Sequence, residues 1–324
     1  RSFHMECADL RILFAGNPAI AVPALEAVAR SFHVVGVLTN PDKPTGRGRH
    51  LEMPPVKEKA LELGIPVLQY DRLLGESREK VASLRPNFLL SFACGHYFGP
   101  KFLALFPEGN ANIHPSLLPK YRGCAPLQFT VLNGESETGI TIQRIVAEID
   151  SGDILAQKIL PLDGTETTAS LSDRVAAEAA DLITRTLAKL CEGRIEGRIQ
   201  SGEPSYTRML SKSDGVIDWN ESARSIHCKV RAMNPWPKAS TTFCGTQLLI
   251  ASVWGDAQHA GEEFSPPCLV PGTVVGLTKG KGLAVVCGDG LLYVTRLQLA
   301  QKKEMDSSAF VNGNPRIIGA VLGS

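Results

Sequence analysis

Three polar side chains carry the clearest chemistry in this sequence. Asn112 and His114 stand two residues apart at the end of an expected strand, and Asp150 follows another expected strand. Residues i and i+2 of an extended segment point to the same side, so Asn112 and His114 can face one cleft. Ligands of open α/β sheets bind beyond the carboxyl ends of the strands. We therefore expect one site to contain all three side chains.

This trio suits acyl transfer to an amine. Asn112 can supply an amide donor for the oxyanion, and His114 can share in oxyanion stabilisation and proton transfer. Asp150 can orient or charge the histidine and accept the proton of the amine. No metal and no covalent nucleophile is required. On residue types alone, a structural role is the commoner alternative, because Asn and Asp also satisfy turns and a histidine can simply be hydrogen-bonded.

Alternating strand and helix patterns must position these side chains. Buried or β-branched runs predict strands at 10–15, 33–39, 65–69, 88–93, 111–113 and 141–146. Helices are expected between them, at about 18–31, 56–63 and 77–84, and a helical apolar spacing continues over 170–190. This order predicts a doubly wound, Rossmann-like α/β domain.

A second region follows a polar stretch that contains few large apolar residues. This stretch, 194–213, is expected to be a linker. Beyond it lie one expected helix and several β-rich runs separated by glycine, at 223–232, 247–253, 272–275, 283–287 and 291–297. Short strands with glycine turns favour a small OB-like β-barrel. We expect a catalytic domain over 6–193 and a C-terminal domain over 214–324.

The whole chain is long and nearly neutral. Its 324 residues exceed what one hydrophobic core usually supports, and its net charge of +1 excludes a protein that is basic throughout. Any nucleic-acid contact must therefore use a local patch. The eight cysteines include no C-x-x-C pair, and no apolar run approaches the roughly 20 residues of a membrane span. We expect a cytoplasmic, monomeric protein without a metal site.

The run NIHPSLLPKYRGCAP, residues 112–126, resembles the signature of the 10-formyltetrahydrofolate-dependent formyltransferases. Asp150, in EIDSGD, stands where this family keeps its aspartate. The resemblance implies that Asn112, His114 and Asp150 are catalytic and that 10-formyltetrahydrofolate is the formyl donor. It also implies a folate pocket formed by Phe92, Ala93, Gly95, Tyr97, Ser116, Leu117, Leu118 and Pro119, although core packing is an alternative for Phe92.

Two further regions bear on the formyl acceptor. The basic loop NPDKPTGRGRH, residues 40–50, resembles an inserted loop of the methionyl-tRNA formyltransferases, and sugar formyltransferases carry a related loop. The C-terminal segments DGVIDW, 214–219, and VRAMNPWP, 230–237, resemble the methionyl-tRNA enzymes. The resemblance therefore implies methionyl-initiator tRNA as acceptor. We nominate as tRNA contacts the basic residues Lys43, Arg47, Arg49, Lys229, Arg231, Lys302 and Lys303. The alternatives are a solvated surface loop for residues 40–50 and solvated surface charges for half of the four C-terminal residues.

Other acceptors stay open at this point. Pro115 stands where methionyl-tRNA formyltransferases usually carry a small residue and where the glycinamide enzymes have proline. An amino-sugar formyltransferase would use a nucleotide sugar, and a formyl-folate hydrolase would release formate without an acceptor. A tRNA-binding protein that had lost catalysis is a third alternative, which the intact trio opposes.

Overall fold

The computed structural model describes residues 7–45, 50–263 and 268–323. The chain divides into two compact units. The first contains the chain up to Gly123 together with Gly139–Leu160 and Ser172–Tyr206, and the second contains Cys124–Thr138, Pro161–Leu171 and the chain from Thr207 onward. This division differs from the predicted boundaries, because two segments from within 6–193 pack with the second unit.

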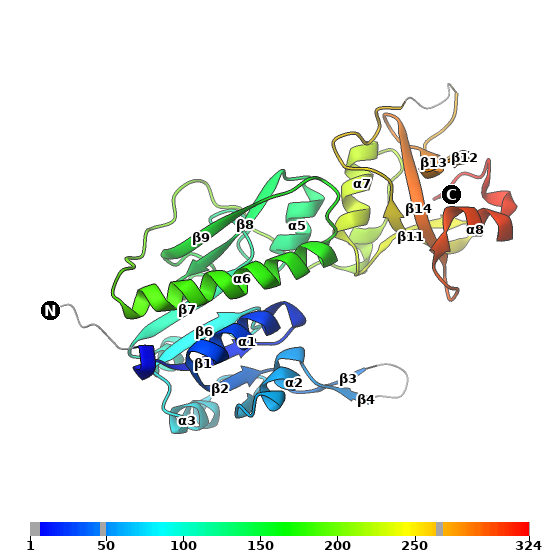
Figure 1. Cartoon of the computed structure of the whole chain (residues 1–324). Coiled ribbons are helices and arrows are strands. Elements are labelled where there is room, and N and C mark those ends of the chain that lie inside the picture. The colour runs from blue at the N-terminus through cyan, green and yellow to red at the C-terminus, as the bar shows by residue number, and fades with distance from the viewer. Residues whose placement is uncertain (1–6, 46–49, 264–267, 324) are drawn as a thin grey trace. The chain divides into compact units, whose positions relative to one another are not determined.

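A seven-stranded sheet forms the centre of the first unit, in the order β5-β2-β1-β6-β7-β8-β9 (Figure 1). The pairs from β5 to β7 are parallel, whereas β8 is antiparallel to β7. An apolar strand pattern indicates burial but not direction, so the sequence could not predict this reversal. The strands are β1 (Arg11–Gly16), β2 (His33–Thr39), β5 (Val67–Gln69), β6 (Phe88–Phe92), β7 (Gly109–His114), β8 (Glu137–Gln143) and β9 (Ile154–Pro161).

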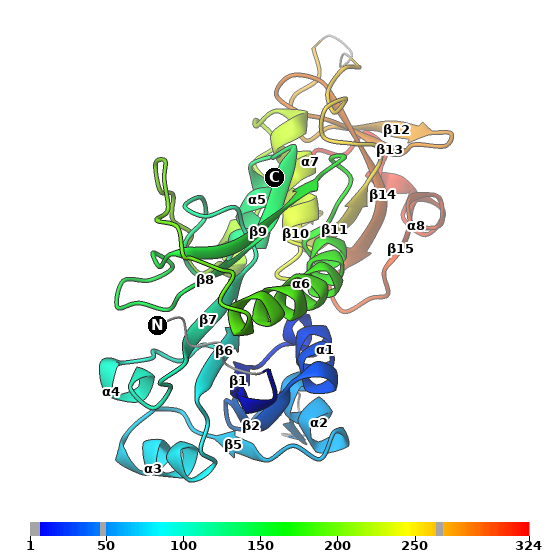
Figure 2. The ribbon, with the colours of Figure 1, turned by 60° about the vertical axis from the view of Figure 1, so that its left-hand side comes forward.

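Helices lie on both faces of this sheet, which confirms the doubly wound prediction. Helices α1 and α6 lie on one side of the sheet and α3 and α4 on the other (Figure 2). The long helix α6 buries Val175, Ala179 and Ile183 at four-residue spacing, as an amphipathic helix requires. The helices are α1 (Val22–Ser31), α2 (Pro55–Glu62), α3 (Gly75–Ser83), α4 (Pro100–Leu103) and α6 (Thr168–Cys191), with 3-10 turns at Cys7–Asp9 and Ala19–Ala21 and a hairpin of β3 (Lys43–Thr45) and β4 (His50–Glu52).

An antiparallel sheet dominates the second unit, in the order β10-β11-β14-β13-β12, with β15 paired to β14. This order is compatible with the predicted small barrel, although within the described ranges no pairing joins β10 to β12. The strands are β10 (Ala239–Phe243), β11 (Thr246–Val253), β12 (Val274–Thr278), β13 (Gly282–Val286), β14 (Leu291–Leu299) and β15 (Met305–Asp306). The helices are α5 (Pro126–Leu132), α7 (Ala223–Ala232) and α8 (Ser307–Gly313), with 3-10 turns at Lys212–Gly215 and Pro315–Ile317.

Helix α7 has the predicted bounds and packs against this sheet. It begins at Ser222, whose side chain accepts a hydrogen bond from Ser225 N at 3.0 Å. Its apolar side chains Ile226 and Val230 join Val294 of β14 in the core of the unit. In the part of the chain that the structure describes, no helix combines the length and the apolar composition needed to span a membrane.

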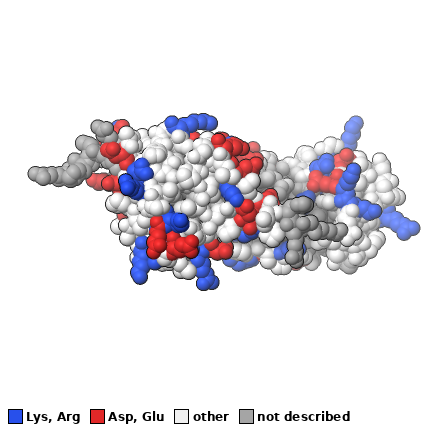
Figure 3. All heavy atoms as spheres, turned by 90° about the horizontal axis from the view of Figure 1, so that it is seen from below, with Lys and Arg blue, Asp and Glu red and all other residues white. Residues whose placement is uncertain are grey.

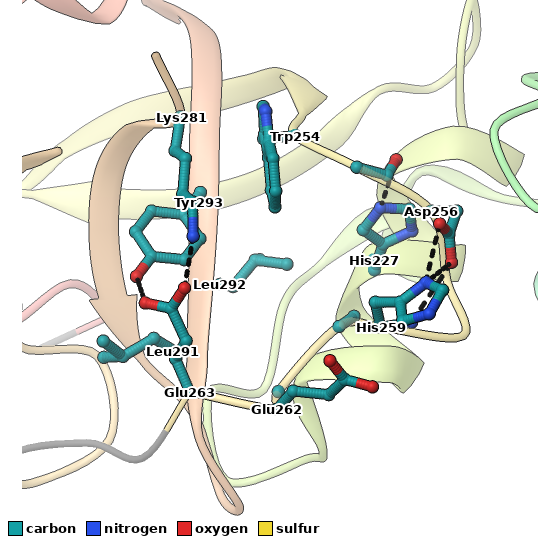
Figure 4. Close-up of a pocket in the computed structure, with 13 residues that line it drawn as sticks. His227, Trp254, Asp256, His259, Glu262, Glu263, Lys281, Leu291, Leu292 and Tyr293 are labelled. Atoms are coloured by element: carbon teal, nitrogen blue, oxygen red, sulfur yellow. Dashed lines mark hydrogen bonds and ion pairs between the residues drawn. The ribbon is translucent and has the colours of Figure 1, made fainter. Parts of the chain in front are cut away.

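His227 of α7 gives the second unit a pH-dependent stability. Burial, and then the charge of Arg231, lower the pKa of His227 from 6.5 to about 4, while Asp256 opposes this shift. The ring lies between two partners: Arg231 Nε donates to Nδ1 at 3.0 Å, and Nε2 lies 3.2 Å from the Gly255 carbonyl (Figure 4). Between the two pKa values the unfolded chain binds more protons, so stability falls as the pH is lowered from 6.5 to 4.

Acidification to pH 4 is therefore expected to remove about 3 kcal/mol of the unfolding free energy through His227 alone. Urea unfolding followed by tryptophan fluorescence at a series of pH values measures this loss. The His227→Gln variant keeps a donor for the Gly255 carbonyl but does not titrate, so its loss should be smaller by that amount. Equal acid sensitivity in both proteins would contradict the prediction.

Candidate active site

The predicted trio comes together where β7 meets β8. Asn112 and His114 lie on β7, opposite Gln143 and Thr141 of the antiparallel β8. Strand alternation places Asn112 and His114 on the same face. Asp150 lies in the loop after β8, and a backbone hydrogen bond from Arg144 N to Asp153 O closes this loop at 2.9 Å. The loop thus returns Asp150 to the strand end from which it started.

His114 is buried, and a backbone carbonyl holds its ring. The Nε2 atom lies 2.8 Å from Tyr121 O. Because a carbonyl only accepts, Nε2 donates there and carries a proton whether the ring is neutral or charged. The Nδ1 atom lies 3.6 Å from Asp150 Oδ1, which exceeds hydrogen-bond distance. The ring nitrogen that faces Asp150 is therefore Nδ1, while Nε2 is held by the backbone.

Asp150 is held through both carboxylate oxygens. Its Oδ2 accepts from Gly123 N at 2.8 Å, and its Oδ1 accepts from Gln143 Nε2 at 2.8 Å. Only 13% of the side chain is exposed, compared with 6% for His114. Two donors suit a carboxylate, which only accepts. The arrangement fixes the direction in which the carboxylate faces the histidine.

Asn112 is half-buried, and its side chain is available for a ligand. Within the described ranges, its amide has no hydrogen-bond partner in the protein, and no buried polar side-chain atom lacks one. The amide of Asn112 therefore reaches solvent rather than serving a turn. This arrangement favours the chemical role over the structural alternative for Asn112.

The residues predicted for the folate pocket divide into buried and open positions. Phe92, Ser116 and Leu118 are buried, and Leu117 and Pro119 are half-buried. Ala93, Gly95 and Tyr97 are exposed, with 67% of Tyr97 open to solvent. The loop 115–119 is fixed to β8, because Thr141 Oγ1 donates to Ser116 O at 2.7 Å and accepts from Leu118 N at 3.1 Å. Buried members can shape the pocket while the open ones meet the ligand.

The basic residues nominated as tRNA contacts differ in their exposure to solvent. Lys43, Lys302 and Lys303 are exposed, and Arg47 and Arg49 lie outside the described residues. Basic and acidic side chains are interspersed on the face in Figure 3, as the near-zero net charge predicts. No single basic field is visible there.

Two of these nominated residues are engaged inside the second unit. Lys229 Nζ donates to Glu221 Oε1 at 2.9 Å, and only 14% of the lysine side chain is exposed. Arg231 is buried, and it donates to Glu166 O at 2.8 Å as well as to His227. These bonds leave Arg231 no surface for a phosphate, so we leave it out of the contacts proposed below.

A pocket of about 290 Å³ lies in the second unit, and most of the charged groups that line it are paired with one another. Figure 4 shows His259 against Asp256, and Lys281 against Glu263 beside Tyr293. In addition, Lys281 Nζ lies 4.7 Å from the ring centre of Trp254. The described residues contain no cluster of side chains suited to a metal ion. The trio in the first unit is therefore the candidate active site.

Comparison with known proteins shows the family of the chain. Residues 10–187 match the formyl transferase family, and residues 209–315 match the formyl transferase C-terminal domain. The methionyl-tRNA formyltransferase of Pelobacter propionicus is 41% identical over 96% of both chains, and that of Trichlorobacter lovleyi is 39% identical over 96% of both. The chain belongs to the methionyl-tRNA formyltransferase family. The resemblance carried by residues 112–126 is thus confirmed.

A solved structure shows the same fold as this family member. The N-formyltransferase from Helicobacter canadensis, in complex with folinic acid and dTDP-3-aminofucose, superposes with a TM-score of 0.63. The match covers 91% of this chain and 100% of that chain at 19% identity. Such a distant likeness speaks for the fold alone.

Several groups that hold the trio of this formyltransferase carry little signal in the sequence. Gln143 ends β8, and a polar residue at the end of an apolar strand is a signal that could have found it. Gly123 and Tyr121 act through their backbones, which side-chain chemistry does not reveal. Gln200 lies in a polar stretch without any local pattern.

Proposed function

We propose that this chain transfers the formyl group of 10-formyltetrahydrofolate to the α-amino group of methionyl-initiator tRNA. The observation that carries the proposal is the pair of His114 Nδ1 and Asp150 Oδ1, 3.6 Å apart on the face that also presents the Asn112 amide. Membership of the methionyl-tRNA formyltransferase family supports the choice of donor and acceptor.

The reaction follows from the contacts of the three side chains. The methionyl amine attacks the formyl carbon, and the carbonyl oxygen becomes an oxyanion that accepts from the Asn112 amide and from Nδ1–H of a protonated His114. Asp150 stabilises the charged ring and accepts the proton that the amine loses. Collapse of the intermediate breaks the bond to N10 of the folate, which takes up that proton. One N–H bond is lost from the amine and one is gained by the folate.

The surroundings of the trio support the two binding roles. Ala93, Gly95 and Tyr97 are exposed in the first unit, and we assign them, with Leu117 and Pro119, to direct folate contact. We assign the tRNA backbone to Lys43, Lys302 and Lys303, which are the exposed described members of the nominated set. The proposal places the protein in the cytoplasm, where charged tRNA is used, and treats one chain as sufficient because one chain supplies the whole trio.

Transfer of labelled formyl from 10-formyltetrahydrofolate tests the proposal. The acceptors to compare are methionyl-initiator tRNA, the same tRNA without methionine, and a nucleotide amino sugar. Label on the charged tRNA alone supports the proposal. Label on the sugar would keep the chemistry and overturn the acceptor, and formate release without any acceptor would indicate a hydrolase.

The double variant Lys302→Ala with Lys303→Ala is expected to raise the KM for methionyl-tRNA and leave kcat nearly unchanged. Each lysine that neutralises a phosphate contributes about 0.9 to the slope of log affinity against log salt. The double variant should therefore lower that slope by about 2 if both lysines contact phosphates. Lys279→Ala, an exposed lysine in the turn after β12, is the matched control. An unchanged salt slope would remove Lys302 and Lys303 from the tRNA interface.

A further inference from the structure

Gln200 lies in the segment predicted to be a linker, yet backbone hydrogen bonds fix this segment within the first unit. On one side of Gln200, Arg198 exchanges backbone hydrogen bonds of 2.8 and 3.0 Å with Ile154. On the other side, Ser205 N donates to Pro119 O at 3.2 Å. These two attachments deliver the half-buried side chain of Gln200 to a defined place.

The hydrogen-bond partners of the Gln200 amide oxygen and amide nitrogen fix the orientation of the amide. Arg122 donates to Gln200 Oε1 from Nη2 at 2.8 Å and from Nε at 3.3 Å. A guanidinium has no acceptor, so the oxygen of the amide must face it. The Nε2 atom then donates to Asp150 O at 2.8 Å and to Gly152 O at 2.9 Å, and carbonyls can only accept. In a flipped amide, the NH₂ group would face the guanidinium donors of Arg122, and the oxygen would face the carbonyl oxygens of Asp150 and Gly152.

The two carbonyls that Gln200 binds belong to the turn that presents the catalytic aspartate. Asp150 has a φ of 52°, a left-handed conformation that is unfavourable for a residue other than glycine. Gln200 ties the backbone of this turn, while Gln143 binds the Asp150 side chain at 2.8 Å. Gln200 Nε2 also lies 3.3 Å from Gln143 Oε1, so the two amides support each other.

We propose that Gln200, oriented by Arg122, is a positioning residue for Asp150. It holds the turn of Asp150 and Gly152 in the conformation that aims the carboxylate at His114 Nδ1. The inference rests on the proposed function, in which Asp150 accepts the proton of the amine. It gives a role in positioning to a segment that was expected to be only a linker. Gln200 itself touches no reacting atom.

The isosteric variant Gln200→Glu tests this role. Its carboxylate still accepts from Arg122 but sets an oxygen against the carbonyls of Asp150 and Gly152. We expect kcat to fall about 10- to 100-fold, because small displacements of a catalytic group cost up to about 10²-fold, with the KM of each substrate changed less than about twofold. Ser201→Glu adds the same charge at an exposed neighbour and should keep kcat within about twofold. Gln200→Ala serves as the second variant if Gln200→Glu does not fold.

Repeating the Gln200→Glu substitution in an Asp150→Ala protein distinguishes a positioning role from a general effect on the structure. In an Asp150→Ala protein, Gln200→Glu should cause no further loss of kcat, because its target is already missing. The same loss in both backgrounds, or near-normal kcat in the single variant, would overturn the inference.

The rate of backbone hydrogen exchange in the peptide 148–153 measures how firmly the turn is held, independently of the reaction. Faster exchange in Gln200→Glu than in the wild type and Ser201→Glu is expected, and unchanged exchange would contradict the inference. If the wild type failed to formylate methionyl-tRNA, the proposed function would fall while this exchange result still decided whether Gln200 holds the turn.

Discussion

Asp150→Ala is expected to slow formyl transfer by about 10²–10⁴-fold in kcat, with little change in the KM of either substrate. The variant removes the carboxylate that faces His114 Nδ1 at 3.6 Å and that receives the proton of the amine in the proposed reaction. The fold should survive, because Asp150 lies in a loop and buries no apolar surface. Single-turnover rates with methionyl-tRNA, together with thermal unfolding, measure the two effects separately.

Asp150→Asn is a sharper version of the same experiment. An asparagine matches the aspartate in shape, yet one of its two acceptors becomes an amide donor that faces either Gly123 N–H or Gln143 Nε2. We expect a loss of at least about 10²-fold despite the isosteric side chain. Asp181→Asn removes the same charge from an exposed position of α6 and should leave turnover unchanged. Comparable rates for Asp150→Asn and the wild type would refute the role of Asp150.

The elements with continuous apolar patterns could be predicted from the sequence nearly to the residue. Strand β2 and helix α7 have the bounds expected for them, at 33–39 and 223–232. Strand β2 is a continuous apolar run that is buried from its second residue onward, and capping at Ser222 marks the start of α7. Local patterns of this kind depend only on neighbouring residues.

Several elements without such a pattern were missed, among them α5, β9, β10 and α8. Helix α5 is only seven residues long and begins at Pro126, and β10 carries three hydroxyl residues among five. Their structure depends on packing within their units, which overrides weak local preference. The same reason explains why 194–213 resembled a linker although residues 198–206 join the first unit.

The proposed catalytic residues and the residue proposed to position Asp150 also differ in how far the sequence reveals them. Asn112, His114 and Asp150 could be nominated from the sequence because residue type, spacing and the family resemblance coincide. Gln200 could not, because it meets Asp150 across 50 residues and its role depends on a turn with positive φ. The sequence thus nominates the groups for the proposed reaction, whereas the residues that orient them can be found only in the folded chain.

Asn112→Ala is expected to lower kcat by about 10²–10³-fold, the loss typical of one missing oxyanion donor. The Asn112 amide has no protein partner in the described part of the chain, so its removal should leave no internal group unpaired and should not reduce stability. Asn312→Ala, at an exposed position of α8, controls for loss of an amide.

The double variant of Asn112 and His114 separates shared from independent action. Both side chains donate to the same oxyanion in the proposed reaction, so the double loss should be smaller than the product of the single losses. Strictly multiplicative losses would mean that the two residues contribute independently of each other. A normal rate for Asn112→Ala would instead leave His114 as the only side-chain donor of the trio to the oxyanion and would return Asn112 to a structural role.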